Sequence, residues 1–182
     1  MTSDPAAHVI GLDLSLTTTG IAGRDWTRLL KPPATIAAAG GLTRLRWITE
    51  AVRDHIATVP AGTLVAVEGP SYGSAAGQQG HHERAGLWWM VYDAVDRDHW
   101  PIAVIPPASL KRYATGKGNA SKDAVLLAAA KRFPWFGGDN NQADALWLAA
   151  MAADHLGHPI ATMPATHRAA LDGVTWPETG NQ

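Results

Sequence analysis

The segment from residue 8 to residue 14 constrains the fold of this 182-residue chain more than any other. Both faces of the segment are apolar except at Asp13. A short run of this kind is typical of an interior strand that helices cover on both sides. A carboxylate in such a strand is costly to desolvate unless a cation or strong hydrogen-bond donors meet it. Asp13 is therefore either a functional acid or a strand-end residue capped by the turn at residues 15–17, and by itself it leaves both readings open.

The rest of the chain alternates between apolar runs, helical periodicities and turn signals. Further strands are predicted at residues 18–22, 35–39, 63–68 and 102–105. Helices are predicted at residues 43–58, 82–98, from about 121, and 140–155. This order predicts an α/β fold with a mixed five-stranded sheet flanked by helices. We expect one domain over residues 1–158 and a peripheral, partly flexible tail over residues 159–182, where Pro, Thr and Gly accumulate.

Composition excludes several classes of protein. The absence of cysteine excludes a disulfide framework and a cysteine-based zinc site. A net charge of −1 and a pI near 6.7 supply no global case for nucleic-acid binding, so that case has to rest on local clusters. No secretory signal is visible, and charge or proline interrupts every apolar stretch before the roughly 18 residues of a membrane span. We expect a soluble, cytoplasmic protein without a membrane partner.

Two further acids repeat the pattern of Asp13. Glu68 ends an apolar strand at the sheet edge where sites collect in α/β folds, although a solvated strand end is the plainer reading. Asp144 lies in the first turns of a very apolar helix, where capping and helix-dipole effects alone favour an acid. Together the three acids would repel one another and become protonated unless divalent cations compensated them. Hard oxygen ligands select Mg²⁺ or Mn²⁺, and two such ions can drive phosphodiester hydrolysis.

Four segments carry a resemblance to a known family. Residues 10–20, 65–68, 116–122 and 143–146 resemble, in order and spacing, the motifs of the RuvC family of Holliday-junction resolvases. The resemblance covers about residues 8–158. It implies a ribonuclease H-like nuclease domain and an endodeoxyribonuclease that cleaves Holliday junctions or other branched DNA with two Mg²⁺ or Mn²⁺ ions.

The resemblance also implies roles for particular residues. Asp13, Glu68 and Asp144 match metal-binding, catalytic carboxylates, and Lys111 and Lys122 match positions that contact DNA phosphates. With these lysines, Arg112 and Lys117 form the one dense basic cluster of the sequence, in a glycine-containing loop where backbone amides can also approach a phosphate. A basic loop that is merely solvated is the alternative reading. Tyr72 falls near an aromatic that the family carries at the junction centre, although a packed loop tyrosine is an equal reading.

One position departs from the family pattern. The family usually carries a fourth acid one helical turn before the last aspartate, and here that position is Asn141. Asn141 would hold a second metal more weakly, or Asp139 would reach in instead. We expect Asn141→Asp to keep or raise activity.

The partner and two competing functions complete the prediction. Branched DNA with two-fold character suits a homodimer, and the aromatic helix at residues 82–98 is the expected interface. Residues 11–20 also resemble the phosphate-binding loop of the actin and sugar-kinase superfamily, which would make the chain an ATP-binding protein. A non-catalytic branched-DNA-binding protein is the third reading. The resemblance also implies a location in the cytoplasm of a bacterial cell or of a phage-infected bacterial cell.

Overall fold

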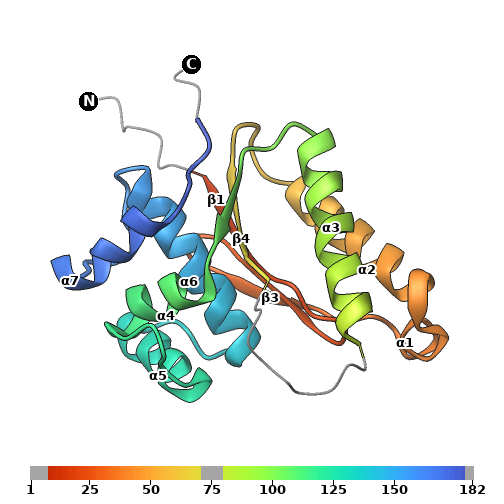
Figure 1. Cartoon of the computed structure of the whole chain (residues 1–182), viewed down its shortest axis with the longest axis horizontal. Helices are drawn as coiled ribbons and strands as arrows, with labels where there is room; N and C mark the ends of the chain where they lie inside the picture. Colours follow the sequence, from red (N-terminus) through yellow and green to blue (C-terminus); the bar gives the residue numbers. More distant parts are fainter. Residues whose placement is uncertain (1–7, 71–79, 179–182) are drawn as a thin grey trace.

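The structure, a computed structural model, describes residues 8–70 and 80–178. Its five strands form one mixed sheet in the order β3-β2-β1-β4-β5 (Figure 1). β1 pairs antiparallel with β2 and parallel with β4, while β2–β3 is antiparallel and β4–β5 is parallel. This arrangement confirms the predicted mixed sheet. The strands are β1 Val9–Asp13, β2 Thr19–Ala22, β3 Thr27–Leu30, β4 Leu64–Glu68 and β5 Ile102–Ile105.

Helices cover both faces of the sheet. α2 and α3 lie on one face, and α4, α5 and α6 lie on the other (Figure 1). Within the described residues, no helix combines the length and apolar character that crossing a bilayer requires. The helices are α1 Ala34–Ala39, α2 Gly41–Ile56, α3 His81–Arg97, α4 Pro107–Thr115, α5 Lys122–Arg132, α6 Asn140–His155 and α7 Ala165–Arg168, followed by the 3₁₀ helix η1 Ala169–Gly173.

The alternation of side chains along β1 and β4 divides the interior into two cores. Ile10 and Leu12 of β1 pack with α2 and α3, whereas Val9 packs on the α6 side. In β4, Leu64 and Ala66 likewise belong to the α6 side. Because side chains two residues apart share a face, the last residues of both strands also face α6.

Two glycines allow α6 to approach the sheet closely. A Cβ on Gly11 would lie 2.0 Å from the carbonyl oxygen of Ala145, and a Cβ on Gly20 would lie 2.1 Å from that of Asn141. Any larger residue at either position would therefore push the helix away. Nearly all of α6 from Ala143 onward is buried, which holds its first turns rigidly over the ends of β1 and β2.

Two predictions about the elements were wrong. Residues 35–39, expected as a strand, belong to α1, since an alanine-rich run that follows Pro33 favours a helix. The third strand is instead Thr27–Leu30, paired with β2 through a turn in which Gly23 N–H donates to the Trp26 carbonyl at 3.0 Å. The polar stretch before Ser121, expected as a loop, contains α4.

The segment from residue 159 to residue 178, expected as a peripheral tail, contributes to the interior. Met163, Ala170 and Val174 are buried in the core on the α6 side. Local composition did not reveal this packing, because it arises from contacts with α4 and α6 that are distant in the sequence. The boundary at residue 158 stays a prediction.

Candidate active site

Asp13 and Glu68 lie side by side at the carboxyl ends of two adjacent parallel strands. The register pairs Leu12 with Val67, so the next residues of β1 and β4 are the two acids. Both face α6, which presents Asp144 from its second turn. Asp13 and Asp144 are each 8% exposed, and Glu68 is partly buried. The three predicted acids thus come from two strands and one helix and meet at one edge of the sheet.

Burial raises the pKa of all three carboxyl groups, and repulsion from neighbouring acids adds to the shifts of Asp13 and Glu68. Desolvation is the largest cause in each case. The pKa of Asp13 rises to about 8, with the charges of Glu68 and Asp144 adding to the effect of burial. The pKa of Glu68 rises to about 7, with Asp144 again contributing, and that of Asp144 rises to about 6. At neutral pH the edge therefore holds buried negative charge that the protein compensates only in part.

The three carboxylates influence one another electrostatically, but they are not arranged as a complete metal-coordination sphere. Among the residues that the structure describes, no group of three or more acidic or histidine side chains stands close enough to form a metal site. Asp13, Glu68 and Asp144 still share the hard oxygen chemistry that Mg²⁺ and Mn²⁺ prefer, and their repulsion is the electrostatic condition that a cation relieves.

Two of the four predicted basic residues lie close enough to these acids to lower their pKa values. Lys111 of α4 and Lys122, the first residue of α5, lower the pKa of Glu68 and of Asp144, opposing the effect of burial. Lys122 also lowers the pKa of Asp13. Arg112 and Lys117 lie exposed beside them, on α4 and in the loop that follows it.

Asn141 and Asp139, the two further candidate ligands, each make a hydrogen bond within the protein. The Asn141 side-chain N–H donates to the Thr18 carbonyl at 3.0 Å, which ties α6 to the turn before β2. Asp139 is the N-cap of α6 and accepts from Gln142 N–H at 3.0 Å in a capping box. Its charge nevertheless raises the pKa of Asp13, so Asp139 lies near the site. Tyr72 lies outside the described residues.

Trp88 supports the site in a way that the sequence did not reveal. Its indole N–H donates to the Glu68 carbonyl at 2.9 Å and so anchors the end of β4 to α3. The sequence predicts Trp88 on a broad apolar face of the helix at residues 82–98, but the buried stripe of α3 is Leu87, Val91 and Val95. Only the folded chain identifies the acceptor of the Trp88 indole N–H.

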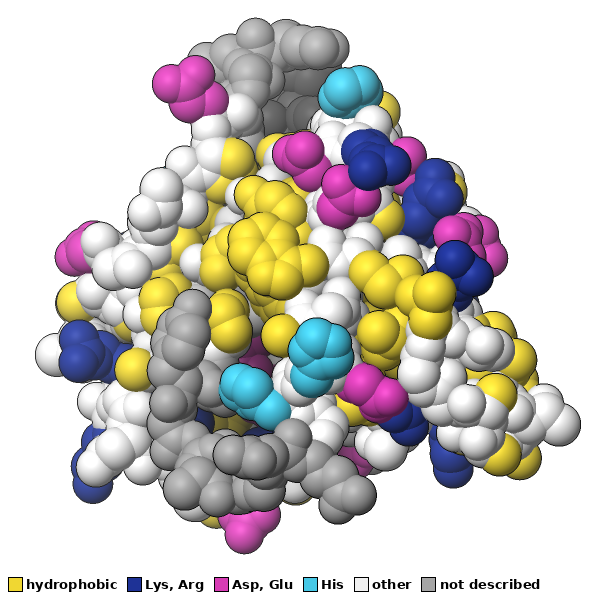
Figure 2. Space-filling view, turned by 45° about the vertical axis from the view of Figure 1, so that its right-hand side comes forward, with side chains coloured by type: hydrophobic (Ala, Val, Ile, Leu, Met, Phe, Trp, Pro, Cys, Tyr) yellow, Lys and Arg dark blue, Asp and Glu magenta, His cyan; other side chains and the backbone are white. Residues whose placement is uncertain are grey.

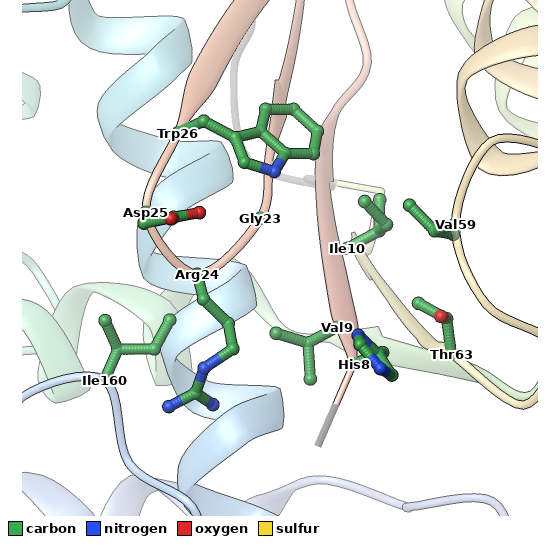
Figure 3. A pocket seen from close by; sticks show the side chains of 10 residues that line it. All are labelled: His8, Val9, Ile10, Gly23, Arg24, Asp25, Trp26, Val59, Thr63 and Ile160. Atoms are coloured by element: carbon green, nitrogen blue, oxygen red, sulfur yellow. The ribbon is translucent and has the colours of Figure 1, made fainter. Parts of the chain in front are cut away.

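One cavity lies at the opposite end of β1 from the acids. A cavity of about 410 Å³ opens at the amino end of β1, between residues that include His8, Arg24 and Trp26 (Figure 3). Arg24 there donates to the His158 carbonyl at 2.8 Å. Sites in α/β sheets collect at the carboxyl ends of the strands, so we place the candidate site at the acidic edge and not in this cavity.

Comparison with solved structures supports the same fold. A structure of Thermus thermophilus RuvC aligns with 86% of this chain and 99% of that chain, at a TM-score of 0.61 and 19% sequence identity. The chain has a RuvC-like fold. A second structure, T. thermophilus RuvC in complex with Holliday junction substrate, aligns with 87% of this chain and 99% of that chain at a TM-score of 0.60 and 18% identity. No protein-family model and no curated protein sequence matches the chain.

The RuvC-like alignment confirms the predicted fold, a ribonuclease H-like α/β domain with a mixed five-stranded sheet between helices. At 18–19% identity the likeness concerns the fold. The function of the acidic site at this edge of the sheet therefore follows only from the residues of the site itself.

Proposed function

We propose that this chain is a divalent-cation-dependent endodeoxyribonuclease that cleaves Holliday junctions or other branched DNA. The observation that carries the proposal is the meeting of Asp13, Glu68 and Asp144 at one edge of the sheet with raised pKa values. Buried like charges oppose folding, so a functional reason for keeping them is a ligand of opposite charge. The complex of T. thermophilus RuvC with Holliday junction substrate supports the choice of branched DNA.

The three carboxylates would hold the cation. Their donor set fits Mg²⁺ or Mn²⁺, and we propose two ions in each site. When bound, such ions activate a water and stabilise the leaving oxygen of a phosphodiester. Asn141 and Asp139 are secondary candidates, since Asn141 offers only a neutral oxygen and Asp139 caps α6 through one of its carboxylate oxygens.

The lysines would bind and orient the DNA backbone. Lys111 and Lys122 lie close enough to influence the carboxylates, so a phosphate held by them would lie next to the acids. Arg112 and Lys117 extend the positive charge along the exposed surface of α4 and the following loop. The chain itself thus supplies charges of both signs at the site, with acids for the cation and lysines for the phosphate.

A homodimer through α3 belongs to the same proposal. Trp89 is 64% exposed there and meets Tyr92 edge to face at 6.0 Å between ring centroids. Figure 2 shows hydrophobic side chains gathered on the side of the molecule that α3 occupies. A two-fold dimer would place two acidic edges on two strands of one junction, in the cytoplasm of a bacterial or phage-infected cell. A monomer by light scattering at micromolar concentration would refute this arrangement.

Cleavage of a labelled synthetic four-way junction tests the proposal. Linear duplex and flap DNA serve as substrate controls, in Mg²⁺, in Mn²⁺ and in EDTA. We expect nicking of the branched substrate with either metal and none in EDTA, and loss of nicking in Asp13→Asn. Asp54→Asn, an exposed acid on α2, is the matched control and should cleave like the wild type.

Two other results would refute the nuclease. Junction binding without cleavage in either metal would favour a non-catalytic branched-DNA-binding protein. A rise in melting temperature on adding ATP, without cleavage, would favour the ATP-binding alternative.

A further inference from the structure

Asp154, near the end of α6, joins three separate parts of the chain. Its side chain is 1% exposed and accepts a hydrogen bond from the Tyr113 hydroxyl of α4 at 2.9 Å. It also pairs with Arg168 of α7, whose Nε lies 3.0 Å and whose second guanidinium nitrogen lies 2.8 Å from its oxygens. Unlike the acids of the candidate site, this buried carboxylate has its charge compensated by the protein itself.

The segment that carries Arg168 makes further contacts with α4. The His167 ring nitrogen Nδ1 lies 2.8 Å from the Tyr113 carbonyl oxygen. Gly116, which ends α4 with φ of 82°, lies beneath the same ring, since a Cβ there would come within 3.0 Å of its Nε2. Leu110 and Tyr113 of α4 share one buried core with Ala170 of η1. The C-terminal segment therefore holds α4 along its buried side.

The same segment is attached to α5 and α6. Arg132 of α5 donates to the Thr162 carbonyl at 2.7 Å. The Trp176 ring stacks on His155 of α6, with 4.1 Å between ring centroids and 6° between planes. Residues 159–178 thus connect the two helices that carry the site lysines to the helix that carries Asp144.

The position of Lys111 depends on how Tyr113 is held. Two residues along an α-helix correspond to about 200° of rotation, so fixing Tyr113 on the buried side directs Lys111 to the other side. The Thr115 hydroxyl donates to the Lys111 carbonyl at 2.8 Å and accepts from Lys117 N–H at 3.2 Å. A shift of α4 would therefore move the whole basic stretch.

We propose that residues 159–178 brace α4 through the Asp154–Tyr113–Arg168 network, with Arg168 as a positioning residue that sets where Lys111 meets a DNA phosphate. The inference rests on the proposed function for its DNA-binding consequence, while the brace itself is a property of the fold. Arg168 is the member to test because its side chain is 54% exposed, so its replacement opens no cavity in the packed core and removes only the cation that pairs with Asp154.

Amide hydrogen exchange of the full chain tests the brace without DNA. In Arg168→Ala we expect exchange within α4 to rise several-fold while exchange within β4 stays unchanged, because the network holds α4 locally. Arg168→Lys should restore much of the protection. Arg97→Ala, which removes an exposed pair with Asp93 at 3.0 Å on α3, is the matched control. Unchanged exchange in α4, or an equal rise across the sheet, would overturn the brace.

Junction binding in EDTA tests the link to Lys111. Loss of one phosphate contact lowers the slope of log K against log salt by about 0.9 and weakens binding about threefold to tenfold. We expect Arg168→Ala to show both the lower slope and the weaker binding. The Lys111→Ala/Arg168→Ala double variant should bind like Lys111→Ala alone. Additive losses with an unchanged slope would overturn the positioning role. No binding by the wild type would refute the proposed function and the role of Lys111, whereas the exchange result alone decides whether the brace exists.

Discussion

The helix α6 carries two buried acids, Asp144 and Asp154, whose surroundings differ completely. The Asp154 carboxylate accepts hydrogen bonds from the Tyr113 hydroxyl and the Arg168 guanidinium, so its buried negative charge is paired. Asp144 is buried as well, but burial raises its pKa to about 6 and its charge raises the pKa of both Asp13 and Glu68. At one end of the helix a carboxylate is paired by donors from two other elements, and at the other end a carboxylate lies near two further acids, with the charges of Lys111 and Lys122 opposing the effect of its burial.

The contrast separates structural burial from functional burial. A buried acid with matched donors is explained by the fold, because removing it would leave its partners unsatisfied. A buried acid among other acids opposes the fold and calls for a ligand. Substitutions at the two ends of α6 should therefore have opposite consequences for stability and activity.

The largest effect is expected at the acidic edge. Glu68→Gln should lower junction cleavage by more than about 100-fold, since loss of a ligand should exceed the loss seen for outer-shell partners of metals. It should not lower the melting temperature, because it removes repulsion with Asp144. Initial cleavage rates in Mg²⁺ and thermal unfolding in EDTA measure the two properties. A variant that cleaves like the wild type but unfolds at a much lower temperature would mean that Glu68 serves the fold and not the reaction.

The next effect is expected at the other end of the helix. Asp154→Asn should lower the free energy of unfolding by about 2 kcal/mol, since the amide cannot satisfy both Tyr113 and the Arg168 guanidinium. Urea denaturation measures the change, with Asp54→Asn as an exposed control. Unchanged stability would mean that the network contributes nothing to the fold.

The pH dependence of stability should show the raised pKa values of the three acids directly. The ordinary pKa values of the three acids are 3.8 to 4.5, and their folded values are about 6 to about 8. Between these limits the folded state binds more protons than the unfolded state, so their contribution to stability falls as pH rises from about 4 to about 8. Urea denaturation across this range in EDTA, compared with Asp13→Asn, isolates the effect.

Mg²⁺ or Mn²⁺ should reduce that loss of stability at pH 8, because a ligand of the folded state stabilises it by mass action. If wild type and Asp13→Asn give parallel curves in EDTA, or if neither metal changes the curve, the acids do not form a cation site.

The smallest effect is expected at Asn141. Asn141→Asp removes the donor to the Thr18 carbonyl and adds charge near Asp144, so it should lower stability in EDTA by about 1 kcal/mol. In Mg²⁺ we expect cleavage to be kept or raised, since the added carboxylate supplies another ligand. Complete loss of cleavage would show that the contact with Thr18 is essential to the site.

Much of the fold could be predicted because the buried strands have uniform local signals. β1, β2, β4 and β5 are short apolar runs bounded by turns, and the predicted positions of these strands are confirmed. β3 was missed because its residues Arg28 and Leu29 are exposed, which leaves no apolar pattern. α4 was missed because its sequence begins with proline and is rich in polar residues, although Pro107 at its start suits a helix.

The candidate site could be predicted in part for the same reason. Asp13 and Glu68 end apolar strands, so their common edge follows from the sheet, and Asp144 follows from an apolar helix. The contribution of Trp88 and the connection of Tyr113, Asp154 and Arg168 could not be predicted, because these contacts join residues 14 to 41 positions apart. Contacts of that kind exist only in the folded chain.

The most direct test compares Asp144→Asn with Asp154→Asn in one experiment, since both acids are buried in the same helix. Cleavage of a labelled four-way junction at saturating protein in Mg²⁺ and thermal unfolding would be measured on each. We predict that Asp144→Asn loses cleavage without losing stability, whereas Asp154→Asn loses stability and retains cleavage when folded. Equal losses of cleavage in both variants, or retained cleavage in Asp144→Asn, would contradict the assignment of the acidic edge as the active site.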